Sequence, residues 1–182
     1  MEAMAHAAGR ELRGVIASAA AGDEVAFTRI VAAYHEDMRR VCVFVARDEA
    51  LADDAVQSAW AIAWRKIGSV REPERLRPWL VSVAVNEAKK NLKKSRQRAE
   101  VEVVTDIAHV PGGRDPATGI DSLDALAAMD RLDPEERALL AMRYAAGFDA
   151  TELSVAIGLS PSGTRTRLER LLARLRQELS DG

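Results

Sequence analysis

The chain has 182 residues, of which 48% are hydrophobic and 30% charged, and its formal net charge is −2. These proportions are those of a globular protein, the negative net charge argues against indiscriminate binding to nucleic acid, and the single cysteine, Cys42, excludes an internal disulfide or a multi-cysteine metal site. The sequence shows neither an apolar run of about 20 residues nor a signal-peptide pattern, which predicts a cytoplasmic protein. Alanine, leucine, arginine and glutamate dominate and β-branched runs are missing, so we expect an all-α fold.

Residues 20–98 read as a helical domain that follows an N-terminal extension, 1–19, which forms either an ordered helix or a free tail. Within 51–67, apolar side chains recur every three or four residues and predict an amphipathic helix that buries Trp60 and Trp64. The segment 68–78 contains two prolines and predicts a loop. A second helix is expected from about Leu76 to Lys94, with a polar face that carries Ser82, Asn86, Lys89, Lys90 and Lys93.

Residues 99–121 lose all helical periodicity and contain Pro111, Gly112, Gly113, Pro116 and Gly119, which predicts a flexible linker between two domains. Charge alternates along the chain at this point. Residues 86–98 carry a net charge of +5, residues 99–124 carry −5, and residues 160–176 carry +4.

Residues 122–182 read as a second helical domain that contains a helix-turn-helix. An earlier helix of this domain is expected to begin at an Asp133 cap, with Pro134 at its first position and acids in its first turn, and to end at Gly147. The small Ser154, four residues before Gly158, allows two helices to approach, and the glycine suits a left-handed turn. In the last helix, leucines form a buried stripe, while the N-terminal half presents Arg165, Thr166, Glu169 and Arg170. A recognition helix enters the major groove in this way, with arginines available to guanines and phosphates.

These segments together resemble an extracytoplasmic-function (ECF) sigma factor, the smallest type of the sigma-70 family. "DDAVQSAWAIAWRKI" is similar to region 2.2, although Ser58 stands where the family usually has Glu. "LRPWLVSVAVNEAKKNLKKSRQR" resembles regions 2.3 and 2.4, in which a Trp-Leu pair leads to an Asn and a basic run. "SGTRTRL" (162–168) is similar to region 4.2, with Arg165, Thr166 and Arg167 in place of the family's Lys, Ser and Arg.

The resemblance implies two polymerase contacts, on the β′ clamp helices and the β flap, and contacts with double- and single-stranded promoter DNA. It also implies control by an anti-sigma factor, and an acidic linker that lies in the basic RNA exit path. It implies neither a cofactor nor a metal, nor any enzymatic activity of the chain itself. We expect the polymerase-binding residues to be Asp53, Asp54, Gln57, Ser58, Ala61 and Arg65. The expected minus-10 contacts are Arg71, Arg75, Arg77, Trp79, Asn86, Lys89, Lys90 and Lys93. The expected minus-35 contacts are Ser162, Thr164, Arg165, Thr166, Arg167, Glu169, Arg170 and Arg174.

Two other functions stay open at this point. A stand-alone helix-turn-helix regulator would bind a palindromic operator as a dimer without polymerase. A helical adaptor would use its basic faces on acidic proteins. Asp54, Gln57 and the segment from Trp79 to Asn86 favour the sigma factor over both. For Trp79 itself, a role in packing or as a wedge is favoured over stacking on a base.

Overall fold

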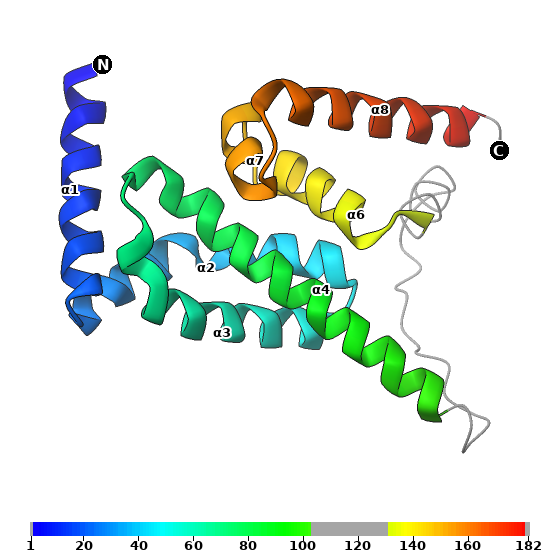
Figure 1. The fold of residues 1–182 in the computed structure, drawn as a ribbon, viewed down its shortest axis with the longest axis horizontal. Helices are drawn as coiled ribbons and strands as arrows, with labels where there is room; N and C mark the ends of the chain where they lie inside the picture. The colour runs from blue at the N-terminus through cyan, green and yellow to red at the C-terminus, as the bar shows by residue number, and fades with distance from the viewer. Residues whose placement is uncertain (1, 103–130, 181–182) are drawn as a thin grey trace, which may run out of the picture.

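A computed structural model describes residues 2–102 and 131–180, and every regular element within them is helical (Figure 1). The all-α prediction is confirmed. The N-terminal domain contains α1 (Glu2–Ala20), α2 (Glu24–Ala46), α3 (Glu49–Lys66), two short 3₁₀ turns, η1 (Ile67–Ser69) and η2 (Pro73–Arg75), and α4 (Leu76–Glu102). The C-terminal domain contains α6 (Pro134–Leu140), the π-helical η3 (Ala141–Ala145), α7 (Ala150–Ile157) and α8 (Pro161–Ser180).

Short aspartate-capped turns join α1 to α2 and α2 to α3. The Asp23 carboxylate accepts hydrogen bonds from the backbone N–H groups of Val25 and Ala26, at 2.9 and 3.0 Å, and so begins α2. Arg47 ends α2 in the left-handed conformation, with φ of 55°, and Asp48 then caps α3. These side chains satisfy helix-end N–H groups that would otherwise lack partners.

Small side chains on α3 allow it to pack closely against α2 and α4. Its buried face includes Ala52, Ala55, Ala59 and Ala63, all with 0% exposure. The apolar stripe expected in 51–67 is therefore confirmed, except that Trp64 is 38% exposed. The aromatic rings of Trp60 and Trp64 both form T-shaped contacts with the Phe27 ring, with centroid distances of 5.7 and 4.9 Å.

The N-terminal extension continues this bundle as a helix. α1 buries Ile16 and Ala19, with 5% and 2% exposure, against α2 and the loop that leads to α4. Of the two forms that the sequence left open for residues 1–19, the structure shows the ordered helix.

α4 is longer than expected. It continues to Glu102, whereas the sequence predicted an end near Lys94, so residues 99–102 extend the helix rather than begin a linker. The rest of the predicted linker, and residues 122–130 of the predicted second domain, lie outside the described residues.

The C-terminal domain begins with the expected aspartate cap. The Asp133 carboxylate accepts from the Glu136 N–H, and the Glu136 carboxylate accepts from the Asp133 N–H, which closes a capping box on α6. Asp149 and Glu152 repeat the same box at the start of α7. Gly147, with φ of 69°, turns the chain between η3 and α7, as the sequence predicted for the end of that helix.

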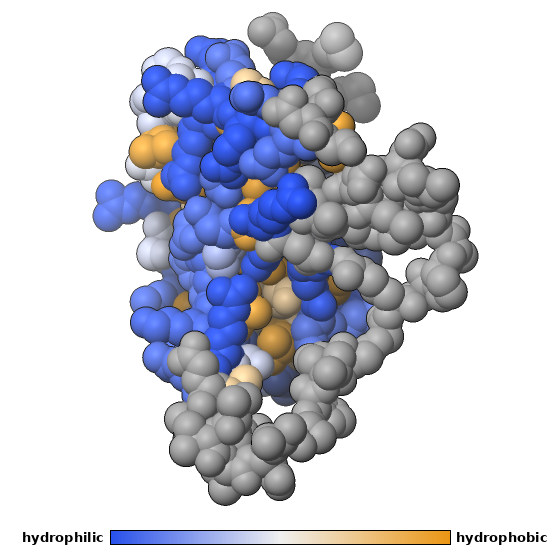
Figure 2. All heavy atoms as spheres, turned by 90° about the vertical axis from the view of Figure 1, so that its right-hand side faces the viewer, coloured by the Kyte–Doolittle hydropathy of each residue, from blue (hydrophilic) through white to orange (hydrophobic). Residues whose placement is uncertain are grey.

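The two domains pack against each other. α7 lies against α4, and α6 and η3 lie against α2 (Figure 1). The interface is partly apolar and includes Phe148, which is fully buried. Arg137 of α6 is also buried, with 4% exposure, and donates to the Val45 carbonyl of α2 at 3.0 Å. Figure 2 shows the side of the molecule that lies on the right in Figure 1. Most of the coloured surface there is hydrophilic, and apolar side chains are visible in a hollow near the middle.

Candidate nucleic-acid interface

The outward face of α3 carries the residues expected to bind polymerase. Asp54, Gln57, Ala61 and Arg65 are exposed and Ser58 is half-buried, because the alanines of the opposite face are packed in the core. Asp53 is also exposed, but its carboxylate accepts from Arg39 Nε of α2 at 2.9 Å. This hydrogen bond is the main cause that raises the pKa of Arg39. The face therefore combines carboxylates, an amide and one cation on a rigid helix.

A pocket opens in the turn between α3 and α4. It has a volume of about 290 Å³ and is lined by the loop 69–72, Arg75, Trp79 of α4 and Val155 of α7. Arg71 and Arg75 are exposed, and Arg75 forms an ion pair with Glu72. The half-buried Trp79 indole gives the pocket an apolar wall, which is a surface on which a base can stack.

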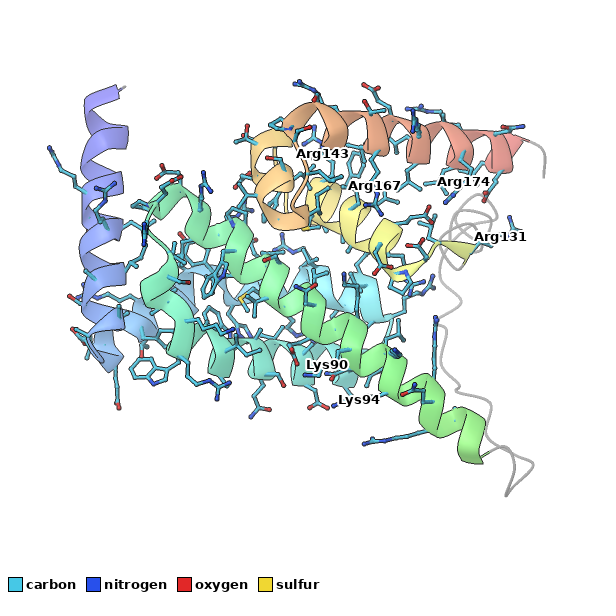
Figure 3. All side chains as sticks on the ribbon, in the orientation of Figure 1. Lys90, Lys94, Arg131, Arg143, Arg167 and Arg174 are labelled. Atoms are coloured by element: carbon cyan, nitrogen blue, oxygen red, sulfur yellow. The ribbon has the colours of Figure 1, made fainter. Side chains whose placement is uncertain are left out.

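The basic face of α4 is divided between two directions. Lys90 and Lys94 point away from the C-terminal domain (Figure 3). Lys90 lies 3.3 Å from the Glu87 carboxylate of the same helix. Lys89, in contrast, faces α6 and forms an ion pair with Glu135 at 3.5 Å. The expectation that Lys89 and Lys90 share one exposed face is wrong, because their directions on the helix differ and the C-terminal domain covers only one of them.

Arg77 does not lie free at the DNA-facing surface as the sequence predicted. Its guanidinium donates to Asp37 Oδ2 at 2.8 Å, to Glu152 Oε1 at 2.9 Å and to the Ala146 carbonyl. It also stacks over the Phe148 ring at 4.5 Å. Burial lowers the pKa of Arg77, but the bonds to the two carboxylates outweigh it and raise the pKa overall. The group is therefore charged and fully engaged between the domains.

The helix-turn-helix has the geometry that the sequence predicted. Gly158 ends α7 with φ of 70°, and the N–H groups of Gly158 and Leu159 both donate to the Ser154 carbonyl. The Ser160 hydroxyl accepts from the Gly163 N–H at 3.1 Å at the start of α8. The glycine is needed because a left-handed residue with a Cβ is strained.

Most of the expected minus-35 residues lie on the exposed side of α8: Ser162, Arg165, Thr166, Arg167, Glu169 and Arg170. Two members of the expected set differ. Thr164 has 0% exposure and points into the domain, so a DNA contact by its side chain is excluded in this fold. Arg174 is 48% exposed, and it pairs with Glu136 of α6 at 2.7 Å (Figure 3). This bond holds α8 against α6.

A groove between α6 and α8 is lined by several arginines of α8. Its volume is about 740 Å³, and its lining includes Arg167, Arg170, Arg174 and the single carboxylate of Glu136. The bond from Arg174 is the main cause that lowers the pKa of Glu136. Three guanidinium groups beside one carboxylate leave an excess of positive charge that attracts phosphate.

The sequence analysis did not identify the acidic residues that form ion pairs with Arg77 and Lys89 of α4. Asp37, Glu135 and Glu152 bind the cations of α4. The only signal for Glu152 was its capping-box position, and that position explains only one of its two oxygens. Among the described residues, no cluster of His, Cys, Asp and Glu could hold a metal ion. In the same part of the chain, no helix has the length and apolar character needed to cross a membrane.

A protein of known structure shares this two-domain helical arrangement. The solved structure of CnrH in complex with the cytosolic domain of CnrY superimposes with a TM-score of 0.67 at 23% identity, over 93% of this chain and 97% of that one. The fold is therefore one that a sigma factor of known structure shares.

Two family models match in the same order as the domains: "Sigma-70 region 2" on residues 30–98 and "Sigma-70, region 4" on residues 122–175. The chain belongs to the sigma-70 family, in its ECF group. The ECF RNA polymerase sigma factor SigM of Mycobacterium tuberculosis is 26% identical over 88% of this chain and 81% of SigM. The probable RNA polymerase sigma factor RfaY of Xanthomonas campestris pv. campestris is 29% identical over 88% of this chain. The chain spans only 42% of the length of RfaY.

Proposed function

We propose that this protein is an alternative sigma factor that binds core RNA polymerase, directs it to promoters and opens the DNA there. The observation that carries the proposal is the pairing of two separate basic surfaces, on α4 and α8, with domains that match sigma-70 regions 2 and 4. The protein acts in the cytoplasm, where the chromosome is transcribed. It has no enzymatic activity of its own, because the polymerase performs the chemistry.

The outward face of α3 binds the β′ clamp helices. Its exposed Asp54 and Gln57 suit a basic partner helix, and charge complementarity of this kind speeds docking and fixes register. The C-terminal domain makes the second contact, on the β flap. Asp54→Arg is expected to abolish co-elution with core polymerase in gel filtration. Glu11→Arg, on the exposed side of α1, is the matched control and should co-elute as the unsubstituted protein does.

The turn before α4 and the helix itself hold the melted minus-10 strand. The pocket beside Trp79 accepts an unstacked base, and Lys90 and Lys93 bind the phosphates of the strand. Trp79→Ala is expected to reduce promoter opening, measured by permanganate reactivity of unpaired thymines. Unchanged opening would assign Trp79 to packing alone.

The N-terminal half of α8 reads the minus-35 duplex. Ser162, Thr166 and Glu169 lie on the outward side of the helix, where base edges would meet it. Arg165 and Arg170 flank them and bind phosphates. Arg165→Ala should weaken binding similarly for all sequences and reduce its salt dependence, whereas Glu169→Ala should change base preference at one position.

A regulatory protein partner is part of the proposal. CnrH, which shares this fold, has been solved in complex with the cytosolic domain of CnrY. We expect this chain to be held by an anti-sigma factor in the same cell. Recovery of no bound inhibitor from unstressed cells would count against that partner, and would leave the promoter function untouched.

A further inference from the structure

We infer that a pocket between α4 and the C-terminal helices binds a small organic anion with an apolar body. The pocket has a volume of about 400 Å³ and is lined by side chains of α4, α6, α7 and α8. Binding sites for small molecules have volumes of about 300–1,000 Å³ and are common where domains meet. Lys90 and Lys93, which are proposed to hold the melted strand, do not line this pocket, so the site does not depend on the promoter function.

Small residues leave the space open. Ala138 of α6, Ala156 of α7 and Gly158 line the pocket at positions where larger side chains would narrow it. The α4 residues that line it recur at steps of three and four along the helix and therefore share one face: Ser82, Val85, Asn86 and Lys89. The pocket thus follows from the pattern of side-chain size on α6 and α7, opposite one continuous face of α4.

One wall of the pocket is apolar. Val85, Leu139 and Met142 line it and are almost completely buried, with 4%, 1% and 2% exposure. The half-buried Ile157 adds an alkyl side chain from α7. A hydrocarbon chain or ring placed against these residues would lose contact with water, which favours binding. The body of the ligand is therefore apolar.

Nitrogen donors give the pocket its charge. Lys89, Asn86 and Arg167 line it, and Glu135 is the one carboxylate among its described residues. The Lys89 ammonium lies 3.5 Å from the Glu135 carboxylate, whereas a short charge-assisted bond measures about 2.7–2.9 Å. An ammonium group has three N–H donors, so Lys89 can bind a second acceptor. Two cations and one carboxylate leave one positive charge in excess, which matches a monoanion.

A monocarboxylate with a medium-length hydrocarbon chain has both required parts. Its carboxylate accepts hydrogen bonds from the Lys89 ammonium and the Asn86 amide, and its chain lies against Val85 and Met142. The ligand touches both domains, so it binds only when they are arranged as in this structure.

The probe is sodium octanoate, and 1-octanol is its uncharged counterpart with the same chain length. The full chain is labelled with [ε-13C]methionine, and the methyl resonance of Met142 is followed by NMR during titration. Met38 is the internal control, because it is fully buried and does not line the pocket. We expect octanoate to shift the Met142 resonance saturably, with half-saturation at about 1 mM or lower, and to leave Met38 in place. Met142→Leu assigns the signal.

Charge variants test the recognition of the anion. Lys89→Gln should weaken octanoate binding by at least about tenfold. Lys90→Gln removes the same charge one residue further on and is the matched control, because Lys90 points away from the C-terminal domain (Figure 3). Glu135→Gln removes the carboxylate that competes for Lys89 and should tighten octanoate binding by about twofold to fivefold.

A size variant tests the place of binding without a change of charge. Ala156→Leu narrows the pocket and should weaken the binding of both probes. Unchanged binding by this variant, or no saturable shift of Met142 in the millimolar range, would overturn the site. Equal affinity of Lys89→Gln and Lys90→Gln for octanoate, or equal affinity of the unsubstituted protein for octanoate and 1-octanol, would overturn the choice of an anion.

Discussion

The turn of the helix-turn-helix depends on one backbone conformation that glycine alone adopts without strain. Gly158 has φ of 70°, and an added Cβ would meet no heavy atom within 4 Å. Gly14, in the interior of α1, also has open space around an added Cβ, and its backbone is helical. Substitution by alanine at the two positions therefore differs in backbone conformation and not in steric contact.

The expected effects have opposite signs. At Gly158 the left-handed conformation costs an alanine about 1–2 kcal/mol, and the lower entropy of the unfolded chain returns about 0.4–1 kcal/mol. Gly158→Ala should thus lower the free energy of unfolding by about 1 kcal/mol. Gly14→Ala should raise it by about 0.5–1 kcal/mol, because alanine favours a helix interior.

Urea unfolding followed by far-UV circular dichroism and by tryptophan fluorescence measures this difference. All three tryptophans lie in the N-terminal domain, so fluorescence reports that domain and circular dichroism reports both. Gly147→Ala, at φ of 69° and again with open space, should repeat the loss seen at Gly158. If Gly158→Ala and Gly14→Ala shift the free energy of unfolding in the same direction, the account of the turn is refuted.

Other expectations follow from single buried or paired groups. Burial raises the pKa of the Cys42 thiol to about 12, so Cys42 should react with Ellman's reagent at pH 8 only after urea unfolds the protein; rapid labelling of the folded protein would contradict its burial. The buried Thr164 hydroxyl has no hydrogen-bond partner within the described residues, so Thr164→Val should raise the free energy of unfolding by about 1 kcal/mol and leave minus-35 binding intact. The bond from Arg174 lowers the pKa of Glu136, so the carboxylate stabilises the fold at neutral pH, and this contribution is lost as pH falls through the lowered pKa. Glu136→Gln should therefore be less stable than the unsubstituted protein at neutral pH, by less than about 1 kcal/mol, and the difference should shrink as the pH is lowered through the acidic range; a difference that does not shrink on acidification would refute the pairing.

Local rules of sequence predicted much of the fold. The cap at Asp133, the turn at Gly158 and the apolar stripe of α3 depend on neighbours within one or two helical turns, and the structure has all three. The end of α4 was predicted too early, because the helical periodicity is lost from residue 99 onward and this loss was taken as the start of a linker. No Gly or Pro stands between Pro78 and Pro111, so nothing local breaks the helix near Lys94.

The site was harder to predict, because its electrostatics depend on pairs far apart in sequence. The groups that bind Arg77 are 40, 69 and 75 residues away, so no spacing rule could identify them. Thr164 has a polar side chain in the same helical turn as exposed arginines, and only the packing of α8 shows that it points inward. Residue types thus predicted the two basic surfaces, and the fold decided which cations are free to bind DNA.

In-vitro transcription tests the central claim most directly. Purified core polymerase, this protein and a fragmented genomic library are combined, and the transcripts are sequenced. The account predicts discrete transcripts that start at a fixed distance downstream of two shared sequence elements, and it predicts their loss with Asp54→Arg. An absence of transcripts, together with binding of the protein alone to a palindromic site, would contradict the sigma-factor function and favour a stand-alone regulator.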